Sequence, residues 1–145
     1  MVQTADEAVD YHFPYVVLAG QDFRDLNVSV SFKPISGRID QAAGIIFRFV
    51  DSGNYYVLRA NALEGNVILF KYVGGVRSSV ASAPTSISTG QWHSLRVTAT
   101  ADSLLGYVDG RLAISVRDST YAQGKVGLWT KADSVTYFDD LVIDY

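Results

Sequence analysis

The chain has 145 residues, and its 12 basic and 15 acidic side chains give a formal net charge of −3 at pH 7. This mild acidity, without a run of lysine or arginine, argues against nucleic acid or an anionic membrane as the main partner. The hydrophobic fraction of 48% is ample for one domain over residues 1–145 and excludes a disordered chain. The absence of cysteine excludes disulfides, a thiolate nucleophile and cysteine-ligated metal sites.

The N-terminal sequence MVQTADEAVDYHFPY lacks the basic start and the apolar stretch of a signal peptide. No apolar run elsewhere approaches the ~20 residues of a membrane-spanning helix, so we expect no membrane span. The localisation stays open between the cytosol and an exported protein whose leader is absent from this sequence.

Short segments that alternate apolar and polar residues follow one another along the chain, and helical periodicity is almost absent. Pro34 should end the first of these segments because it cannot donate a hydrogen bond to a neighbouring strand. About ten short strands separated by turn signals predict an all-β fold, a two-sheet antiparallel jelly-roll β-sandwich. In chain order the expected strands are 27–33, 44–50, 55–61, 67–73, 93–99, 104–108, 111–116, 124–131 and 135–143, with 44–73 as a three-stranded meander.

Three local features carry packing predictions. The pair Asp109-Gly110 is typical of a type I′ turn and should place Tyr107 opposite Leu112. Gly127 is expected where a neighbouring strand or a ligand approaches the backbone closely. Trp92 follows a glycine turn and is expected to close one end of the core.

Three stretches carry a family resemblance. GQWHSLRVTATADSLLGYVDGRL (90–112) and GKVGLWTKADSVTYFDDLVI (124–143) resemble runs in laminin G-like and concanavalin A-like lectin/glucanase jelly rolls. GIIFRFVDSGNYYVLRANALEGNVILFKY (44–72) is similar to bacterial domains of that superfamily labelled glycoside-hydrolase-like or 3-keto-disaccharide hydrolase-type. The resemblance covers residues 13–143 and implies a jelly roll that binds or processes carbohydrate, often in secreted or periplasmic proteins.

The residues needed for catalysis are not evident, so the sequence does not decide whether the protein is an enzyme but favours a non-catalytic function. Glucanases of this superfamily place two carboxylates on one strand in a Glu-x-Asp-x-Glu pattern, but the only glutamates here are Glu7 and Glu64. A serine–histidine–aspartate triad would have to use His12 or His93. His93 shares the strand parity of the apolar Leu95, which favours a structural histidine.

Strand parity suggests which side chains face away from the core. The reading depends on alternation alone, because successive side chains of a strand point to opposite faces. The expected core-facing residues are Tyr56, Leu58, Ala60, Ile68, Phe70 and Tyr72, which leaves Val57, Val67 and Leu69 on the opposite face with the polar side chains.

We expect those polar side chains to form a carbohydrate-binding face. Aromatic rings stack on the C–H groups of sugars, while arginine, asparagine and lysine bind hydroxyls. Clustered basic residues on an acidic protein further favour an anionic glycan. As alternatives, the arginines pair across strands, the indole belongs to the core and the lysines are merely solvated. The expected ligand-binding residues are Arg48, Tyr55, Arg59, Asn61, Lys71, Trp129 and Lys131.

A structural calcium ion is implied only by resemblance. Phe138-Asp139-Asp140-Leu141 resembles the closing strand of jelly-roll carbohydrate-binding modules, in which an aspartate helps to hold calcium. That resemblance would assign Asp139 and Asp140 to the metal, with Asp22 and Asp25 as further oxygen donors. The alternative is that Asp139 or Asp140 accepts backbone hydrogen bonds or pairs with an arginine. We expect no other cofactor.

Three functions therefore compete. The leading one is a non-catalytic, lectin-like module that binds carbohydrate on one sheet face. The second is a hydrolase or lyase acting on a sugar derivative, which would need Arg48, Arg59 and an aspartate in a deep pocket. The third is an adhesion or assembly module in which Val57, Val67 and Leu69 are exposed. The oligomeric state is not predicted.

Overall fold

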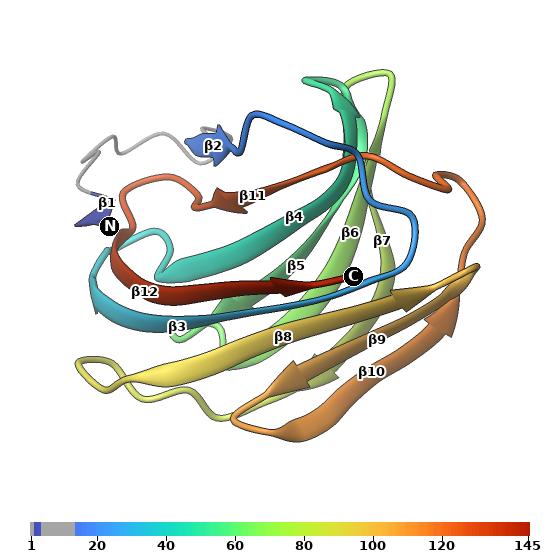
Figure 1. The fold of residues 1–145 in the computed structure, drawn as a ribbon. Helices are drawn as coiled ribbons and strands as arrows, with labels where there is room; N and C mark the ends of the chain where they lie inside the picture. Colours follow the sequence, from blue (N-terminus) through green and yellow to red (C-terminus); the bar gives the residue numbers. More distant parts are fainter. Residues whose placement is uncertain (1, 4–13) are drawn as a thin grey trace.

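The computed structural model describes residues 2–3 and 14–145, which form two stacked antiparallel sheets of six strands each (Figure 1). In spatial order, sheet A contains β1 (Val2–Gln3), β12 (Val135–Asp144), β3 (Leu26–Ser36), β8 (His93–Thr100), β9 (Ser103–Val108) and β10 (Arg111–Arg117). Sheet B contains β2 (Tyr15–Val17), β11 (Lys125–Trp129), β4 (Ala42–Asp51), β5 (Asn54–Asn61), β6 (Asn66–Val73) and β7 (Val76–Pro84).

The chain moves between the sheets in a jelly-roll pattern. The meanders β4–β7 and β8–β10 each stay within one sheet, whereas β1, β2, β3, β11 and β12 alternate between the two. The predicted all-β, two-sheet architecture and the expected 44–73 meander are confirmed. No helix long and apolar enough to cross a membrane occurs in the part of the chain that the structure describes.

The main core lies between the sheets and follows from alternation in β3. Val28 and Val30 are almost fully buried and pair across to Val97 and Leu95 of β8, which are buried as well. Pro34 does not end this strand, contrary to the prediction, because β3 runs on to Ser36. The Pro34 carbonyl points to the β8 side, where it accepts a hydrogen bond from Gly90 N (2.7 Å). Because the N–H and C=O of one residue point to the same side of an antiparallel strand, the pairing of Pro34 with β12 does not need the N–H that proline lacks.

Sheet B is unusual because both of its faces are buried. Residues of β4 and β5 alternate between the main core and a second apolar cluster on the face of the sheet that points away from sheet A, here called the outer face. The second cluster contains Ala42, Ile46, Tyr55, Val57, Phe70, Tyr72 and Trp129.

Two of the local predictions are confirmed and one is wrong. Asp109 and Gly110 both have positive φ (50° and 78°), and Tyr107 pairs with Leu112 across the turn. Gly127 allows the approach of β2, because a Cβ at this position would lie 2.3 Å from the carbonyl oxygen of Val16. Trp92, expected in the core, is 51% exposed because it precedes β8 in a surface turn rather than lying within the sandwich.

The strand β7 was not expected from the sequence. Its residues are mostly serine, alanine and valine, and no bulky inward-facing residue marks a period of two. It forms because β6 offers an edge to pair with over nearly its whole length, from Asn66↔Pro84 to Val73↔Val76. β7 and β10 are thus the edge strands on one side of the sandwich.

Candidate functional site

Five of the seven predicted ligand-binding residues gather on the outer face of sheet B. Tyr55, Arg59 and Asn61 occupy alternate positions of β5, and Trp129 and Lys131 occupy alternate positions at the end of β11 and just beyond it. All five are buried, with exposed fractions between 0% for Asn61 and 6% for Lys131. The structure therefore brings these residues together but places most of their surface out of contact with solvent.

The polar members form a connected network, which we call the polar cluster (Asp40, Arg59, Asn61, Glu64, Asn66 and Lys131). Asn61 Nδ2 donates to Asp40 Oδ1 at 2.6 Å, and Lys131 Nζ lies 3.2 Å from Asp40 Oδ2. Asn61 Oδ1 meanwhile accepts the backbone N–H groups of Leu63 (3.0 Å) and Glu64 (3.2 Å). Asn61 therefore connects the charged pair to the β5–β6 turn.

Arg59 is the most confined cation of the polar cluster. Its terminal nitrogen donates to Glu64 Oε2 at 3.0 Å and to Asn66 Oδ1 at 2.5 Å, and its guanidinium carbon lies 5.2 Å from the centroid of the Phe70 ring. Burial lowers the pKa of Arg59, and the opposing charge of Glu64 offsets only part of that effect. Arg59 Nε is buried and donates no hydrogen bond to any described residue.

Beside the polar cluster lies an aromatic patch (Tyr55, Phe70, Tyr72 and Trp129). The rings of Tyr55 and Tyr72 stack with centroids 4.4 Å apart, and burial raises the pKa of both phenols, helped for Tyr55 by the neighbouring Tyr72. Gly44 makes room for this packing, because a Cβ there would lie 3.1 Å from the Trp129 ring and 2.8 Å from Val57.

Two partly exposed side chains connect this face to the surface. Tyr15 of β2 is 42% exposed, and its ring centroid lies 6.1 Å from that of Tyr55. At the polar end, the Glu64 side chain is also 42% exposed while it pairs with the buried Arg59.

Arg48 does not belong to the outer face, and its predicted placement there is wrong. An irregularity in β4 between Phe47 and Asp51 shifts the strand register, and Arg48 itself adopts φ of 49°. Its guanidinium therefore donates to the carbonyl oxygens of Arg24 (2.9 Å) and Tyr121 (3.1 Å), at the end of the main core. It lies 1% exposed, and burial lowers its pKa.

Lys71 is also on the other side of sheet B, because the parity assigned to β6 is inverted. Leu69 pairs directly with Leu58, so both point into the main core, and Lys71 shares that face. Lys71 Nζ pairs with Asp118 Oδ2 at 3.0 Å and bonds to Thr120 Oγ1 at 3.1 Å. Ile68, Phe70 and Tyr72, expected in the main core, instead pack on the outer face.

The apolar side chains proposed for an assembly surface are not exposed. Val57 and Val67 are 0% exposed and Leu69 is 1% exposed. Val67 and Leu69 belong to the main core because the parity of β6 is inverted, as for Lys71. Val57 lies on the predicted side of β5, but that outer face is itself buried. These three residues do not offer a protein interface.

His93 fixes a surface loop and is not placed to activate a serine nucleophile. Its Nδ1 lies 2.8 Å from Asp109 Oδ2, and its Nε2 lies 2.9 Å from the Ser88 carbonyl oxygen and 3.3 Å from Ser88 Oγ. The order serine–histidine–aspartate suggests a triad, but an Nε2 that contacts a carbonyl oxygen acts as a donor and cannot accept the serine proton. His12, the other histidine, lies outside the described residues.

The residues assigned to calcium by resemblance are exposed, and the carboxylates of Asp22, Asp25 and Asp139 bond to backbone N–H groups or to a lysine. Asp139 Oδ1 accepts the backbone N–H of Asp140 at 2.9 Å, which matches the backbone-bonding alternative. Asp22 pairs with Lys125 at 3.1 Å, and Asp25 accepts the backbone N–H of Ala101. Within residues 2–3 and 14–145, no group of three or more acidic or histidine side chains is arranged to hold a metal. Calcium at Asp139 and Asp140 stays a prediction.

Sequence reasoning missed several contributors to this face. Asp40, Glu64 and Asn66 lie in loops or at a strand start, where alternation gives no information, and Phe70 and Tyr72 were assigned to the wrong side. Asp133 was also missed, although its carboxylate accepts the backbone N–H groups of Arg38, Ile39 and Asp40 at 2.7–3.2 Å and so positions Asp40. Turn-forming residues such as Asn61 to Asn66 were visible in the sequence, but their partners were not.

Comparisons with known proteins place this fold. No family model matches the sequence. Levanase of Bacillus subtilis (strain 168) is 31% identical over 111 residues, which are 76% of this chain and 16% of levanase, so the chain spans only a small part of that relative. The carbohydrate-binding module CBM66 from Bacillus subtilis superposes with a TM-score of 0.84 at 23% identity, over 94% of this chain and 84% of the module.

A galectin is similar at greater distance. Sheep galectin-11, in a complex with glycerol, gives a TM-score of 0.63 at 12% identity, over 94% of this chain and 98% of the galectin. These likenesses confirm the fold that the sequence predicted: the chain is a two-sheet jelly-roll β-sandwich, as in CBM66 and the galectin.

Proposed function

We propose that the chain is a non-catalytic carbohydrate-binding module that holds its glycan at the outer face of sheet B. The observation that carries this proposal is the buried guanidinium of Arg59, whose Nε has no hydrogen-bond partner among the described residues, beside the aromatic patch. A buried donor without an acceptor destabilises the fold, and an acceptor atom of a bound ligand would satisfy it.

The chemistry of the face suits a sugar. Rings of the aromatic patch can stack on sugar C–H groups, while the arginine, amide and carboxylate groups of the polar cluster bind hydroxyls in both directions. Support also comes from the comparisons, because CBM66 is named as a carbohydrate-binding module and levanase is named after the polysaccharide levan.

The charge balance of the polar cluster refines the expected ligand. Arg59 is paired with Glu64 and Lys131 with Asp40, so neither cation is left to attract an anion. We therefore favour a neutral glycan at this face over the anionic glycan that the sequence alone favoured. Because levanase is a relative by sequence, levan is the first glycan to test.

Isothermal titration with levan, and with other polysaccharides as comparators, tests the proposal. Arg59→Ala should weaken binding about tenfold or more, since hydrogen bonds to charged groups contribute about 1.5–3 kcal/mol each. Arg48→Ala is the matched control, because Arg48 is equally buried in the neighbouring strand but lies on the opposite side of the sheet. Both variants are compared at a temperature where circular dichroism finds them folded.

Two results would contradict the proposal. One is the absence of binding to every polysaccharide tested. The other is equal loss of affinity in folded Arg59→Ala and folded Arg48→Ala, which would indicate a general effect of lost stability rather than a site on the outer face.

A further inference from the structure

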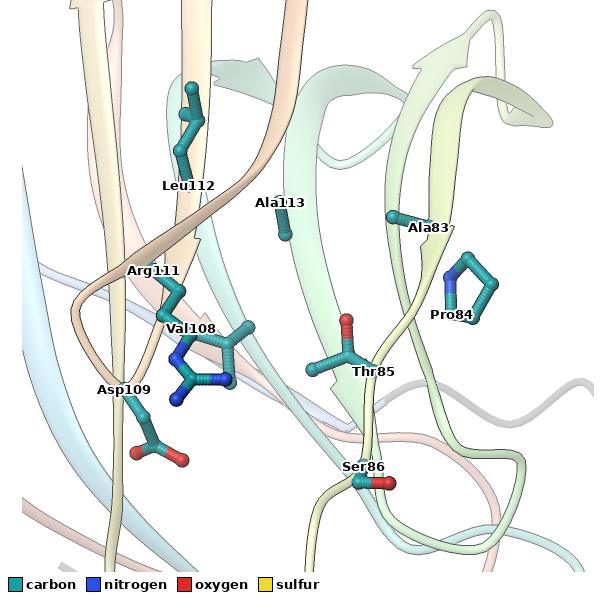
Figure 2. A pocket seen from close by; sticks show the side chains of 9 residues that line it. All are labelled: Ala83, Pro84, Thr85, Ser86, Val108, Asp109, Arg111, Leu112 and Ala113. Atoms are coloured by element: carbon teal, nitrogen blue, oxygen red, sulfur yellow. The ribbon is translucent and has the colours of Figure 1, made fainter.

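A pocket of about 660 Å³ opens on the side of the sandwich where the edge strands β7 and β10 face each other (Figure 2). One wall is the end of β7 and the residues after it, from Ala83 to Ser86, and the other is the β9–β10 turn with the start of β10. The volume is typical of small-molecule sites. The pocket shares no residue with the polar cluster or the aromatic patch.

The pocket exists because the two edge strands have small side chains where they face each other. Ala83 and Ala113 line the pocket from opposite walls, and their small side chains leave the space between the sheets unfilled (Figure 2). The register of β10 also shifts at Ala113, between Leu112 and Ile114. A bulge of this kind bends an edge strand and redirects the neighbouring side chains.

Both walls are held in place by hydrogen bonds. Asp109 accepts the backbone N–H of Ser94 at 2.9 Å, contacts His93 Nδ1 at 2.8 Å and donates its own N–H to the Ser94 carbonyl oxygen at 2.9 Å. On the other wall, Thr85 N donates to the Gly65 carbonyl oxygen at 2.9 Å. The pocket is therefore preformed, which lowers the entropy cost of binding.

Arg111 provides the distinctive chemistry. Its guanidinium makes no hydrogen bond or ion pair with any described residue, and Figure 2 shows it turned toward the space between Asp109 and Thr85. The Asp109 carboxylate bonds to His93 and Ser94 rather than to Arg111, so the donors of the guanidinium are left for a ligand. A planar guanidinium with free donors binds a carboxylate in a bidentate manner.

The remaining lining suits a sugar ring. The side-chain hydroxyls of Thr85 and Ser86 form no hydrogen bond with the described residues and can bind ring hydroxyls. Pro84, Val108 and Leu112 provide apolar surface for C–H groups, and Leu112 is 55% exposed at the pocket.

We propose that this pocket is a second binding site, which takes a saccharide unit bearing a carboxylate, with Arg111 as the partner of the carboxylate. The saccharide part of this inference rests on the proposed function, whereas the carboxylate part rests on Arg111. An acidic sugar on a glycan chain would then be bound at the sandwich edge independently of the outer face of sheet B.

Amide chemical shifts of the full chain, measured by NMR during titration, test the proposal with glucuronate, glucose and acetate as probes. Glucuronate should shift the resonances of residues 84–86 and 109–113 and bind more tightly than glucose or acetate. Arg111→Ala should weaken glucuronate binding about tenfold or more. Arg117→Ala is the matched control, because Arg117 lies in the same strand but pairs with Asp102 at 2.8 Å outside the pocket. Thr85→Val supplies a second, nearly isosteric variant, which should weaken both sugars.

Several results would overturn the inference. Equal affinity for glucose and glucuronate would show that the carboxylate does not contribute to binding. Equal affinity for acetate and glucuronate would show that the sugar ring does not contribute. Unchanged glucuronate affinity in Arg111→Ala, or chemical-shift changes confined to residues outside the pocket, would show that glucuronate does not bind in this pocket. Arg59→Ala separates the two proposals, because it should leave glucuronate binding intact while it weakens levan binding.

Discussion

Arg48 and Arg59 lie in adjacent strands of one sheet and are both almost completely buried, yet their guanidinium groups are on opposite sides of that sheet. Arg48 donates to backbone carbonyls of two loops at the end of the main core, whereas Arg59 contacts side chains of the β5–β6 turn on the outer face. The difference arises from the irregularity in β4, which moves Arg48 out of the alternation that β5 retains. The same residue type therefore fastens loops at one position and contributes to a candidate binding face at the other.

The first prediction concerns Arg48 as a stabilising residue. Arg48→Met keeps the apolar length of the side chain but leaves the Arg24 and Tyr121 carbonyl oxygens without their donors. We expect the free energy of unfolding to fall by about 2–4 kcal/mol, as measured by urea denaturation. Levan affinity of the folded variant should stay within about twofold of the wild type. A stability equal to that of the wild type would contradict the anchoring role.

The second prediction uses the two tryptophans as separate reporters. Trp129 is 1% exposed on the outer face, and Trp92 is 51% exposed in a surface turn. The emission of Trp92→Phe should be blue-shifted and resistant to acrylamide, while that of Trp129→Phe should be red-shifted and readily quenched. Because the side chains of the outer face are buried, glycan binding there requires a local rearrangement.

That rearrangement should change the fluorescence of Trp92→Phe on addition of levan and leave the fluorescence of Trp129→Phe unchanged. A levan response confined to Trp129→Phe would place the glycan near Trp92 instead, and would remove the outer face as the site.

The third prediction concerns pH. Burial by itself raises the pKa of Asp133, but the backbone N–H groups of Arg38, Asp40 and Ile39 outweigh it and lower the pKa below the ordinary value of 3.8. A lowered folded-state pKa adds stability above the ordinary value, and this contribution is lost as the pH falls through the folded-state pKa.

Asp133→Asn should therefore be less stable than the wild type by about 1–3 kcal/mol at pH 7, and the difference should shrink below about pH 4. Thermal unfolding from pH 7 to pH 2.5 measures both quantities. A difference that stays constant across this range would show that the charge of Asp133 does not contribute.

The fourth prediction concerns the contact of β2 with β11. A Cβ at position 127 would lie 2.3 Å from the Val16 carbonyl oxygen, so Gly127→Ala must displace β2 or distort β11. We expect a loss of about 1–3 kcal/mol in stability, with faster amide exchange at Leu18, which donates to Val126 O at 2.9 Å. Exchange in β8 and β9 serves as the internal control and should not change. Unaltered exchange at Leu18 would contradict the proposed close approach.

Much of the fold was predictable from the sequence for local reasons. The alternation of β3 predicts Val28 and Val30 on one buried face, and the pair Asp109-Gly110 predicts a tight hairpin, because both depend on backbone geometry within a few residues. The same logic placed Tyr55, Arg59 and Asn61 on one face, since β5 is regular over its length.

The errors fall where alternation carries no information. β6 is apolar on both faces, so its parity is fixed only by the pairing of Leu69 with Leu58, a contact between strands. Arg48 is displaced by a register shift that no single-strand pattern encodes, and Trp92 was assigned to the core on its size and its position after a glycine turn. For β6 and Arg48 the deciding partners lie on other segments of the chain.

The sequence by itself determined that this protein is a cysteine-free, all-β sandwich without the usual paired carboxylates of a glucanase, because composition, turn residues and strand periodicity act locally. Only the tertiary structure decided which residues share the outer face of sheet B, that Asp40, Glu64 and Asn66 complete the polar cluster, and that a pocket with Arg111 opens between β7 and β10. The physical reason is that hydrogen bonds and ion pairs across strands depend on register and sheet stacking, which are set by contacts between residues far apart in the chain.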